Sequence, residues 1–349
     1  MPAAIIGVGT AVPQSRSQQE LWDNFFSRHH AGDALAEKIW QRSGVDTRSG
    51  VVDPLIEDVS QWGTGARMRR FIDEALPLGK LALERALDDS GLAPDDIGLL
   101  TVVSCTGYAT PGLDIMLASE LGLPTSVQRL HIGHMGCYAA IPGIGAVADA
   151  TAARGLASLL LCVELPSLHV QHATDEIEQV VAHALFADAA AALVLVPGTE
   201  PAGLEVVDLI ARTDVSTSAM MTWDITDHGF RMGLSPLVPK VLGMHVASVV
   251  KELLDKHGLT PADVGSWVVH PGGPRIVEVV AQELGLEDSQ MDHSREILRT
   301  QGNCSSATVL LILESMMADK QIGPGTYSVM LAFGPGLTLY GALLRDRRQ

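Results

Sequence analysis

The chain has 349 residues, of which 47% are hydrophobic and 19% are charged, and its formal net charge is -17 at pH 7. This length accommodates two domains or two halves of one large fold, and the hydrophobic fraction is sufficient for a sizeable core. The excess of acidic groups argues against a nucleic-acid-binding or membrane-surface protein, because both need a positive field. The apolar runs are shorter than a bilayer span, and the N-terminus does not resemble a signal peptide. The composition therefore predicts a cytoplasmic protein with no nucleic-acid or membrane partner.

The cysteines and the arginines provide two further observations about possible binding sites. The chain has four cysteines, Cys105, Cys137, Cys162 and Cys304. They show no C-x-x-C spacing, which predicts reduced thiols rather than a metal site or a disulfide framework. A local basic cluster for a phosphorylated ligand stays open despite the net charge, and its candidate residues are Arg42, Arg48, Arg67, Arg69 and Arg70.

The first clear elements follow one another from residue 82. The stretch "ALERALDDSGLAPDDIGLLTVVSCTG" (82–107) predicts a helix that ends at Gly91, a turn at Pro94 and a buried strand that ends in a glycine-containing loop. Further on, "HIGHMGCYAAIPGIG" (131–145) places Cys137 between the end of a predicted strand and the start of a small apolar helix. A cysteine at a strand-to-helix junction is a candidate for chemistry as well as for packing.

The pattern recurs in the second half. The stretch "VVKELLDKHGLTPADVGSWVVHPGG" (249–273) again predicts a helix, a proline turn and a buried strand. Gly91 and Gly258 are 167 residues apart, and Cys137 and Asn303 are 166 apart. The shared order favours a duplicated α/β unit over two unrelated helix-turn-strand segments. We therefore predict two halves, residues 1–200 with the cysteine and residues 201–349 with His270 and Asn303.

Three polar residues fall next to glycines at matched ends of the two halves: Cys137 in "HMGCYAA", His270 in "VVHPGG" and Asn303 in "QGNCSSA". Singly, each is ordinarily a core cysteine, a loop histidine or a helix cap. Together they predict a site in which a helix start and an imidazolium lower the pKa of the thiol below about 7.5. His270 and Asn303 would stabilise an enolate or a thioester oxyanion.

At these residues the chain resembles the type III polyketide synthases, the chalcone-synthase-like enzymes of the thiolase superfamily. The motifs that carry the resemblance span nearly the whole chain: "TGYATPGLDIMLASELGL", "MGCYAA", "HALFADAAAALVLV", "VVHPGGPRI", "GNCSSATVLLIL" and "AFGPGLTLYGALL". The resemblance implies a thiolase-like fold, in which two duplicated halves form a five-layered αβαβα core. It also implies malonyl-CoA and an acyl-CoA starter as substrates, no metal and no other cofactor, and a homodimer.

The resemblance assigns roles to individual residues. Cys137 would hold the acyl starter and the growing chain as a thioester, while His270 and Asn303 would bind malonyl-CoA and stabilise the enolate left by decarboxylation. Phe186 matches the family's gatekeeper, and Thr110 lies in the loop that reaches the neighbouring subunit. The remaining implied positions are Ser305 in the substrate pocket, Arg42 and Arg48 at coenzyme A, and Gly334, Pro335 and Gly336 in the cyclisation loop.

Other positions depart from the plant pattern. Met232 stands where a second gatekeeper phenylalanine is usual, and Trp223 and His169 stand where smaller residues are common. Because methionine adapts to flexible apolar chains, we expect a fatty acyl starter and an alkylpyrone, alkylresorcinol or other aromatic product. A malonyl-only starter stays open, since Trp223 and His169 would equally shrink the cavity. An acyl carrier protein also stays open as the donor of the starter.

Other functions fit the same residues less well. A β-ketoacyl-ACP synthase III-like enzyme shares the fold and the Cys, His and Asn set, but "HPGG" and "FGPGL" fit it less well. A hydroxymethylglutaryl-CoA synthase-like enzyme would need a glutamate motif that we do not find. An inactive thiolase-fold binding protein predicts loss of a catalytic residue, and a thiol protease leaves the duplication and Asn303 unexplained.

Overall fold

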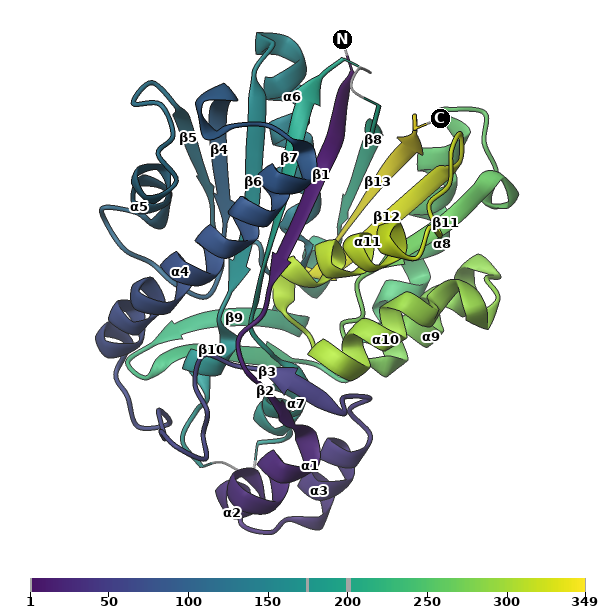
Figure 1. Cartoon of the computed structure of the whole chain (residues 1–349). Coiled ribbons are helices and arrows are strands. Elements are labelled where there is room, and N and C mark those ends of the chain that lie inside the picture. The colour runs from purple at the N-terminus through teal and green to yellow at the C-terminus, as the bar shows by residue number, and fades with distance from the viewer. Residues whose placement is uncertain (1, 174–175, 199–201, 349) are drawn as a thin grey trace.

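The computed structural model describes residues 2–173, 176–198 and 202–348, and within them nine strands form one mixed sheet in the order β11-β12-β13-β8-β1-β7-β6-β4-β5 (Figure 1). The strands of the sheet are β1 (Ala3–Ala11), β4 (Ile97–Val103), β5 (Gln128–Ile132), β6 (Ala157–Glu164), β7 (Ala189–Pro197), β8 (Leu204–Thr213), β11 (Val264–Val269), β12 (Tyr327–Gly334) and β13 (Thr338–Asp346). Two small two-stranded sheets stand apart from it: β2 (Ser15–Ser17) with β3 (Thr47–Ser49), and the hairpin of β9 (Met221–Thr226) with β10 (Gly229–Leu234).

The helices complete the framework. They are α1 (Gln18–Leu21), α2 (Ser27–His29), α3 (Ala34–Gln41), α4 (Thr64–Ser90), α5 (Leu113–Glu120), α6 (Ala140–Arg154), α7 (Ile177–Leu185), α8 (Val238–Asp255), α9 (Pro274–Leu284), α10 (Asp292–Gln301) and α11 (Thr308–Ala318). In Figure 1 both termini lie at one end of the molecule, while α1 to α3 and the β9–β10 hairpin lie toward the other end.

The two halves of the sheet share one topology. In the first half the order is β5-β4-β6-β7-β1, and in the second half it is β11-β12-β13-β8. In each half the strand that comes first in the sequence pairs antiparallel with the one that comes last, β1 with β7 and β8 with β13. The two halves join where β1 pairs antiparallel with β8, with Ala3 opposite Val206. The described part of the second half lacks a counterpart of β5, and a short turn closed by a capping box of Glu287 and Gln290 precedes α10 there. This shared strand order is the structural form of the predicted duplication.

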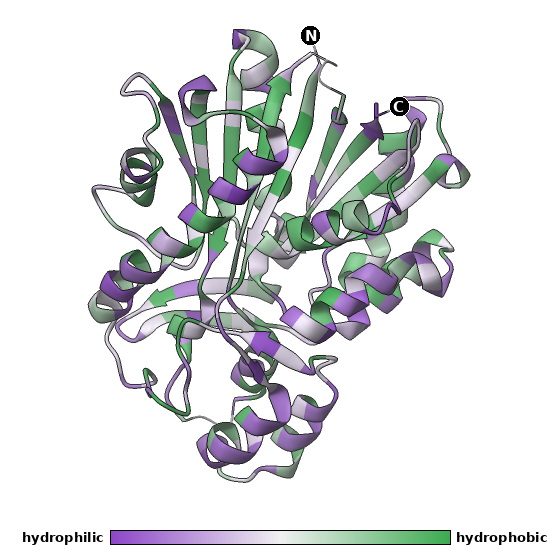
Figure 2. Ribbon diagram, viewed as in Figure 1, coloured by the Kyte–Doolittle hydropathy of each residue, from purple (hydrophilic) through white to green (hydrophobic). Residues whose placement is uncertain are grey.

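Alternating side chains place the strands between helical layers. In β6, Leu159 and Leu161 pack toward α4 and α5, whereas Leu160 and Cys162 pack toward α6 and α11. In β12, Val329 packs on the opposite side, toward α8 and α9. A strand that buries both faces in this way lies inside a layered core, and Figure 2 shows the strands as mainly hydrophobic. The arrangement is the five-layered α/β core expected from the sequence, with α6 and α11 in its middle layer.

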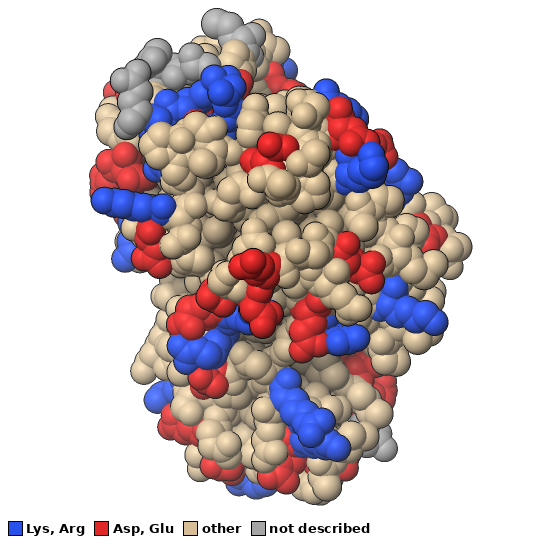
Figure 3. Space-filling view, turned by 90° about the vertical axis from the view of Figure 1, so that its right-hand side faces the viewer, with Lys and Arg blue, Asp and Glu red and all other residues tan. Residues whose placement is uncertain are grey.

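Two further expectations concern the chain as a whole. The predicted boundary between residues 200 and 201 lies outside the described residues, so the division into 1–200 and 201–349 stays a prediction. Within the part of the chain that the structure describes, we find no helix with the length and apolar character to cross a membrane. On the face shown in Figure 3, basic and acidic groups alternate over a mostly uncharged surface.

Candidate active site

Cys137 lies in a single 3-10 turn, Gly136–Tyr138, directly before α6 in the middle layer. Gly136 adopts φ +76°, and a Cβ built there would lie 2.7 Å from Cδ of Pro335. Gly334 is equally constrained, because its Cβ would lie 3.3 Å from the Cys137 nitrogen. The Gly334–Gly336 segment, which we expected to be a cyclisation loop, therefore packs on the turn that holds Cys137.

Cys137, His270 and Asn303 line the same cavity, which has a volume of about 1050 Å³. His270 follows β11, and its backbone nitrogen donates to the Leu331 carbonyl at 2.8 Å, so β12 fixes its position. Its ring is completely buried, and neither ring nitrogen has a hydrogen-bond partner. An unpaired buried imidazole is costly unless a ligand engages it. The structure thus brings together the three residues that the sequence analysis selected.

Asn303 connects the two halves at the cavity. Its backbone nitrogen donates to the Leu185 carbonyl at 2.8 Å, and its carbonyl accepts from the Ala187 nitrogen at 3.0 Å. Phe186, between these two residues, is thereby held next to Asn303, with its ring on the cavity wall. The Asn303 Oδ1 accepts from the backbone nitrogen of Ser305 at 2.9 Å, which leaves the amide NH2 group to act as the donor in the cavity.

The protonation of the site differs from the sequence-based expectation. Burial raises the pKa of the Cys137 thiol to about 12, although hydrogen bonds from Ser305 and Asn303 oppose the rise. Burial also lowers the pKa of His270 to about 3. The expected pKa below about 7.5 is therefore wrong, because desolvation of the thiol outweighs the helix start and no acidic group among the described residues pairs with the His270 ring. The resting site holds a neutral thiol and a neutral imidazole.

A buried carboxylate behind the nucleophile escaped the sequence analysis. Glu164, at the end of β6, accepts from the Thr106 hydroxyl at 2.7 Å and the Ser306 hydroxyl at 2.6 Å. Cys105 is part of the same network, since its backbone nitrogen donates to Glu164 at 3.0 Å and its Sγ lies 3.6 Å from the Ser305 hydroxyl. Burial raises the pKa of Glu164. The available signal was a single acidic residue that ends an otherwise apolar strand, "LLLCVE".

Three aromatic rings, those of His169, Trp223 and Phe230, pack together near Phe186 and line a smaller cavity with it. His169 stacks on Phe230 with ring centroids 4.5 Å apart, and Trp223 meets both rings edge-on. Hydrogen bonds fix the set: the Trp223 indole donates to the Cys105 carbonyl at 2.8 Å, and His169 Nδ1 accepts from the Phe230 nitrogen at 2.9 Å. Burial lowers the pKa of His169 to about 3, so its ring is neutral. Met232, on β10, extends this wall into the cavity of Cys137.

The two arginines assigned to coenzyme A differ in their surroundings. Arg42 is exposed and lines the cavity together with Lys38 and Arg275. Arg48 is buried, and its guanidinium donates to the carbonyls of His183 and Phe186. Its carbonyl partners leave Arg48 turned into the protein, which does not fit phosphate binding. The sequence analysis assigned no role to the other two cations, although Arg275 lies within the motif "VVHPGGPRI".

The remaining predicted residues lie outside the cavity lining. Ser305 is 3% exposed with φ +49°, and it contacts the thiols rather than open space. Thr110 lies on an exposed loop, where its hydroxyl donates to the Tyr108 hydroxyl at 3.0 Å. All four cysteines are free and buried. Among the described residues, no group of three or more His, Cys, Asp or Glu side chains is arranged to hold a metal ion.

Comparison with known proteins places the chain in a family. Residues 1–201 match the N-terminal domain of the chalcone and stilbene synthases, and residues 210–347 match the C-terminal domain. A 1,3,6,8-tetrahydroxynaphthalene synthase of Streptomyces peucetius subsp. caesius is 34% identical, covering 98% of this chain and 93% of the relative. An alpha-pyrone synthesis polyketide synthase-like protein of Mycobacterium tuberculosis is 33% identical, covering 88% of this chain and 81% of that protein.

A solved structure agrees with this relationship. The 1,3,6,8-tetrahydroxynaphthalene synthase of Streptomyces coelicolor A3(2), described as a bacterial type III polyketide synthase, superposes with a TM-score of 0.92 at 27% identity, covering 99% of this chain and 100% of that structure. Matches over both domains and almost the full length leave no segment that would suggest a different architecture. The chain belongs to the chalcone and stilbene synthase family of type III polyketide synthases, which are condensing acyltransferases.

Proposed function

We propose that the chain extends an acyl-CoA starter, preferably a fatty acyl-CoA, by repeated decarboxylative condensation with malonyl-CoA, and that the product is an alkylpyrone, an alkylresorcinol or another aromatic polyketide. The observation that carries the proposal is the shared cavity of Cys137, His270 and Asn303. It brings a nucleophile from one half to two hydrogen-bond donors from the other.

Loading of the starter begins from the neutral pair. Neutral His270 accepts the proton of the Cys137 thiol while the sulfur attacks the acyl-CoA carbonyl, so that a charge forms only during the reaction. The C–S bond to coenzyme A then breaks, and the departing thiolate takes the proton back from His270. The acyl group remains on Cys137 as a thioester.

Extension uses His270 and Asn303 as hydrogen-bond donors to a developing negative charge. Malonyl-CoA loses carbon dioxide, and the electron pair of the broken C–C bond becomes an enolate on the thioester oxygen. The Asn303 amide NH2 and one N–H of His270 donate to that oxygen, and the unpartnered ring nitrogens of His270 fit this role. The enolate carbon then attacks the Cys137 thioester, a C–C bond forms, and the thiolate leaves. The lengthened acyl-CoA reloads for the next cycle.

The residues that line the cavity favour particular starter groups. The cavity is lined largely by apolar side chains, including Val181, Leu185, Leu234 and Ile276, which supports a fatty acyl group. A malonyl-only starter is the second candidate, and the locked rings of His169, Trp223 and Phe230 favour it by narrowing the space behind Phe186. Both candidates agree with relatives whose names are a tetrahydroxynaphthalene synthase and an alpha-pyrone synthesis protein.

Charged residues at the cavity and the exposed edge of the sheet support proposals for the substrates and for the oligomeric state. Lys38, Arg42 and Arg275 give the cavity mouth the charge that coenzyme A phosphates require. We propose that no metal or further cofactor takes part, since the chemistry needs only a thiol, a base and two donors. We also propose a homodimer, because β5 is a sheet edge with most of its side chains exposed and the Thr110 loop lies beside it.

A product screen tests the proposal. The purified protein would be incubated with malonyl-CoA, alone and with acyl-CoAs from acetyl to long-chain, without a carrier protein and beside a Cys137→Ala control. Products that contain several malonyl-derived units and are absent from the control are expected by mass spectrometry. Growth from malonyl-CoA alone would select the second starter candidate. A single extension, or activity only with a malonyl-carrier protein, would contradict an iterative polyketide synthase.

A further inference from the structure

One edge of β10 is covered by side chains instead of by another strand. Among the described strands β10 pairs only with β9, in a register that sets Met232 opposite Trp223. An edge of this kind leaves backbone N–H and C=O groups that need other partners when they are buried. Here the partners are the buried side chains of His169, Gln171 and Gln179.

The hydrogen bonds along this edge follow the two-residue period of a strand. Gln171 Nε2 donates to the carbonyl of Phe230 at 3.0 Å, and Gln179 Nε2 donates to the carbonyl of Met232 at 2.6 Å. His169 Nδ1 accepts from the Phe230 nitrogen at 2.9 Å. Because the backbone groups of successive strand residues point to opposite edges, residues 230 and 232 face the same edge. The two glutamines thus take the place of a neighbouring strand.

The amide of Gln179 can face β10 in only one way. A backbone carbonyl has no proton to donate, so the group that faces Met232 must be the NH2 end of the side chain. Both Gln179 and Met232 are buried, and loss of this donor would leave the carbonyl without a partner in the interior. Glutamine is mostly exposed in proteins, so its burial against a strand edge indicates a specific role.

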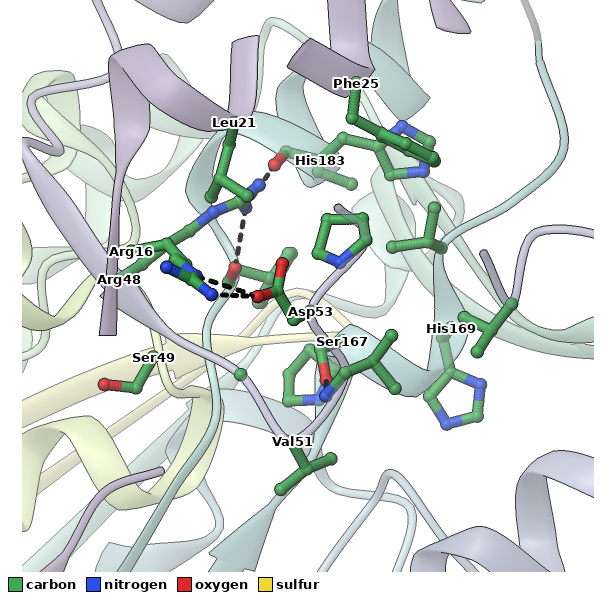
Figure 4. A pocket seen from close by; sticks show the side chains of 18 of the residues that line it. Arg16, Leu21, Phe25, Arg48, Ser49, Val51, Asp53, Ser167, His169 and His183 are labelled. Atoms are coloured by element: carbon green, nitrogen blue, oxygen red, sulfur yellow. Dashed lines mark hydrogen bonds and ion pairs between the residues drawn. The ribbon is translucent and has the colours of Figure 1, made fainter. Parts of the chain in front are cut away.

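The helix that carries Gln179 is anchored to the catalytic residues at its other end. Leu185, the last residue of α7, accepts at its carbonyl from the backbone nitrogen of Asn303 at 2.8 Å. Arg48 donates to the carbonyl of His183 in the last turn of the same helix (Figure 4). The helix spans about 9 Å between residues 179 and 185, at 1.5 Å per residue. The position of β10 relative to Asn303 is therefore set through α7.

This connection fixes the spacing of two side chains at the cavity of Cys137. Phe186 follows α7 directly, Met232 lies on β10, and both line that cavity. The bond from Gln179 to the Met232 backbone joins the two elements that carry them. A change in this bond would alter the distance between Phe186 and Met232 without removing either side chain.

A second contact joins α7 to β10, but it is weaker. Arg231 forms an ion pair with Glu176, the residue before the first turn of α7, and the two side chains are 40% and 53% exposed. Exposed ion pairs contribute little, because water and salt screen them. The buried bond of Gln179 is therefore the contact that holds β10 against α7.

We propose that Gln179 is a positioning residue: its amide holds Met232 at a fixed distance from Phe186, and this spacing selects the acyl groups that reach the nucleophile. Gln171 supports the same strand edge beside it. The inference rests on the proposed function, because selection is expressed in the acyl thioester that forms on Cys137. It goes beyond that function by assigning selectivity to a side chain that does not line the cavity of Cys137.

Two substitutions of Gln179 separate its hydrogen bond from its shape. Gln179→Leu keeps the approximate size and removes the donor. Gln179→Glu also keeps the shape, and its carboxyl group donates to the Met232 carbonyl when protonated but repels it when ionised. Burial raises the pKa of a carboxyl group above about 4.3, its value in an exposed side chain. This variant is therefore a donor at low pH and loses that ability at high pH.

The assay measures selection directly. Each protein would be incubated with acetyl-, hexanoyl-, dodecanoyl- or palmitoyl-CoA without malonyl-CoA, and acyl transfer to Cys137 would be followed by intact-protein mass spectrometry. The measured quantity is the ratio of rates for the two starters that the unmodified protein distinguishes most. Because both starters react with Cys137 and His270, effects of pH on the chemistry cancel in this ratio.

Two controls accompany the variants. Gln282→Leu replaces an exposed glutamine on α9. Thr151→Val removes a buried hydrogen bond from the Thr151 hydroxyl to the Ser158 hydroxyl, at 2.7 Å, near the end of α6 that is remote from Cys137. The second control shows what a general loss of stability does to the ratio. Both controls should keep the ratio of the unmodified protein.

Loss of the donor should weaken selection more than it slows transfer. Gln179→Leu should lower the ratio by about tenfold, since an apolar pocket discriminates one methylene by about 10- to 200-fold when its walls are well placed. Gln179→Glu should keep the ratio of the unmodified protein at about pH 6 and should resemble Gln179→Leu at about pH 8.5. A merely structural role would slow every starter equally and would give no ratio that depends on pH.

The remaining outcomes separate this inference from the proposed function. An unchanged ratio in Gln179→Leu, or a ratio in Gln179→Glu that is the same at both pH values, would overturn the positioning role while leaving acyl loading intact. An unmodified protein that loads every length at the same rate would overturn it as well, since no selection would exist. Absence of any acyl adduct on Cys137, with every acyl-CoA, would overturn the proposed function itself.

Discussion

The turn that carries Cys137 and the turn that carries Asn303 are two versions of one structure. Each begins with a glycine of φ +76°, Gly136 or Gly302, and each continues through a 3-10 turn into a helix of the middle layer, α6 or α11. Each glycine is packed by the opposite half: Pro335 lies against Gly136, and Ala187 lies against Gly302. The two turns thus share a left-handed glycine and a 3-10 turn before the helix, and each half supports the turn of the other.

The side chains on these two turns perform different tasks. The first turn presents a thiol, which is a nucleophile, and the second presents an amide whose oxygen is already occupied by Ser305. His270 comes from a strand end of the second half, so the covalent step and the charge-stabilising steps are divided between the halves. A duplicated fold therefore yields one site in which a nucleophile comes from one half and the charge-stabilising donors come from the other.

The largest effect is expected at the first turn. Cys137→Ala should reduce acyl loading below detection in intact-protein mass spectrometry, because no other thiol lines the cavity within the described residues. Cys162→Ala is the control, since that cysteine is also buried but lies on β6 in the core, away from the cavity lining. Acyl transfer to another cysteine in the Cys137 variant would contradict the assignment.

Substitution of Asn303 or His270 is expected to affect decarboxylation more than acyl loading. Asn303→Ala should slow carbon dioxide release from malonyl-CoA by about 10²-fold or more, the usual cost of losing one oxyanion donor, and should slow acyl loading less. His270→Ala should show the same preference for decarboxylation with some loss of loading, because His270 is also the proton acceptor. Equal losses in both assays for Asn303→Ala would remove the division of labour between the halves.

The packing of Gly136 by the opposite half predicts a smaller effect, on stability. Gly136→Ala should lower the free energy of unfolding by more than about 1–2 kcal/mol, because it adds a contact with Pro335 to the cost of a left-handed conformation. Gly155→Ala isolates that conformational cost, since φ is +68° there and no atom lies within 4 Å of the new Cβ. Equal losses in denaturant titrations would show that packing by the opposite half contributes nothing.

The smallest effect concerns a buried histidine. The pKa of His169 is about 3 in the folded protein and about 6.5 in an unfolded chain, so the unfolded state binds more protons between these values. Its contribution to stability is therefore present above pH 6.5 and is lost as the pH falls toward 3. His169→Gln should reduce the slope of unfolding free energy against pH by up to about 1.4 kcal/mol per pH unit in that window. An unchanged slope in urea titrations would contradict a neutral His169.

The features that depend on local pattern were predictable from the sequence. Glycine and proline punctuation identified the repeated unit, and the predicted strand ends located Cys137, His270 and Asn303. Features that depend on three-dimensional packing were not predictable in this way. Arg48 carries a guanidinium group, which commonly binds phosphate, but the fold directs it toward two backbone carbonyls. Desolvation of Cys137 depends on residues from both halves, which explains why the expected low pKa was wrong.

Two other features that were not predicted also depend on three-dimensional packing. Glu164 gave only a weak signal, because a single acidic residue at a strand end is ordinarily solvated, and its partners come from segments about 60 and 140 residues away. The approach of Trp223 on the β9–β10 hairpin to Phe186, with ring centroids 6.5 Å apart, was also missed. Pairing between segments so distant in sequence has no signature in the local pattern of hydrophobic residues.

The most direct test of the account is a quenched time course with an acyl-CoA starter and isotopically labelled malonyl-CoA, analysed by intact-protein and peptide mass spectrometry. The account predicts a ladder of species on the Cys137 peptide, each heavier by one labelled acetate unit, and no ladder in Asn303→Ala although its starter adduct persists. A ladder on another residue, or a starter adduct that never gains more than one unit, would contradict an iterative synthase that holds its chain on Cys137.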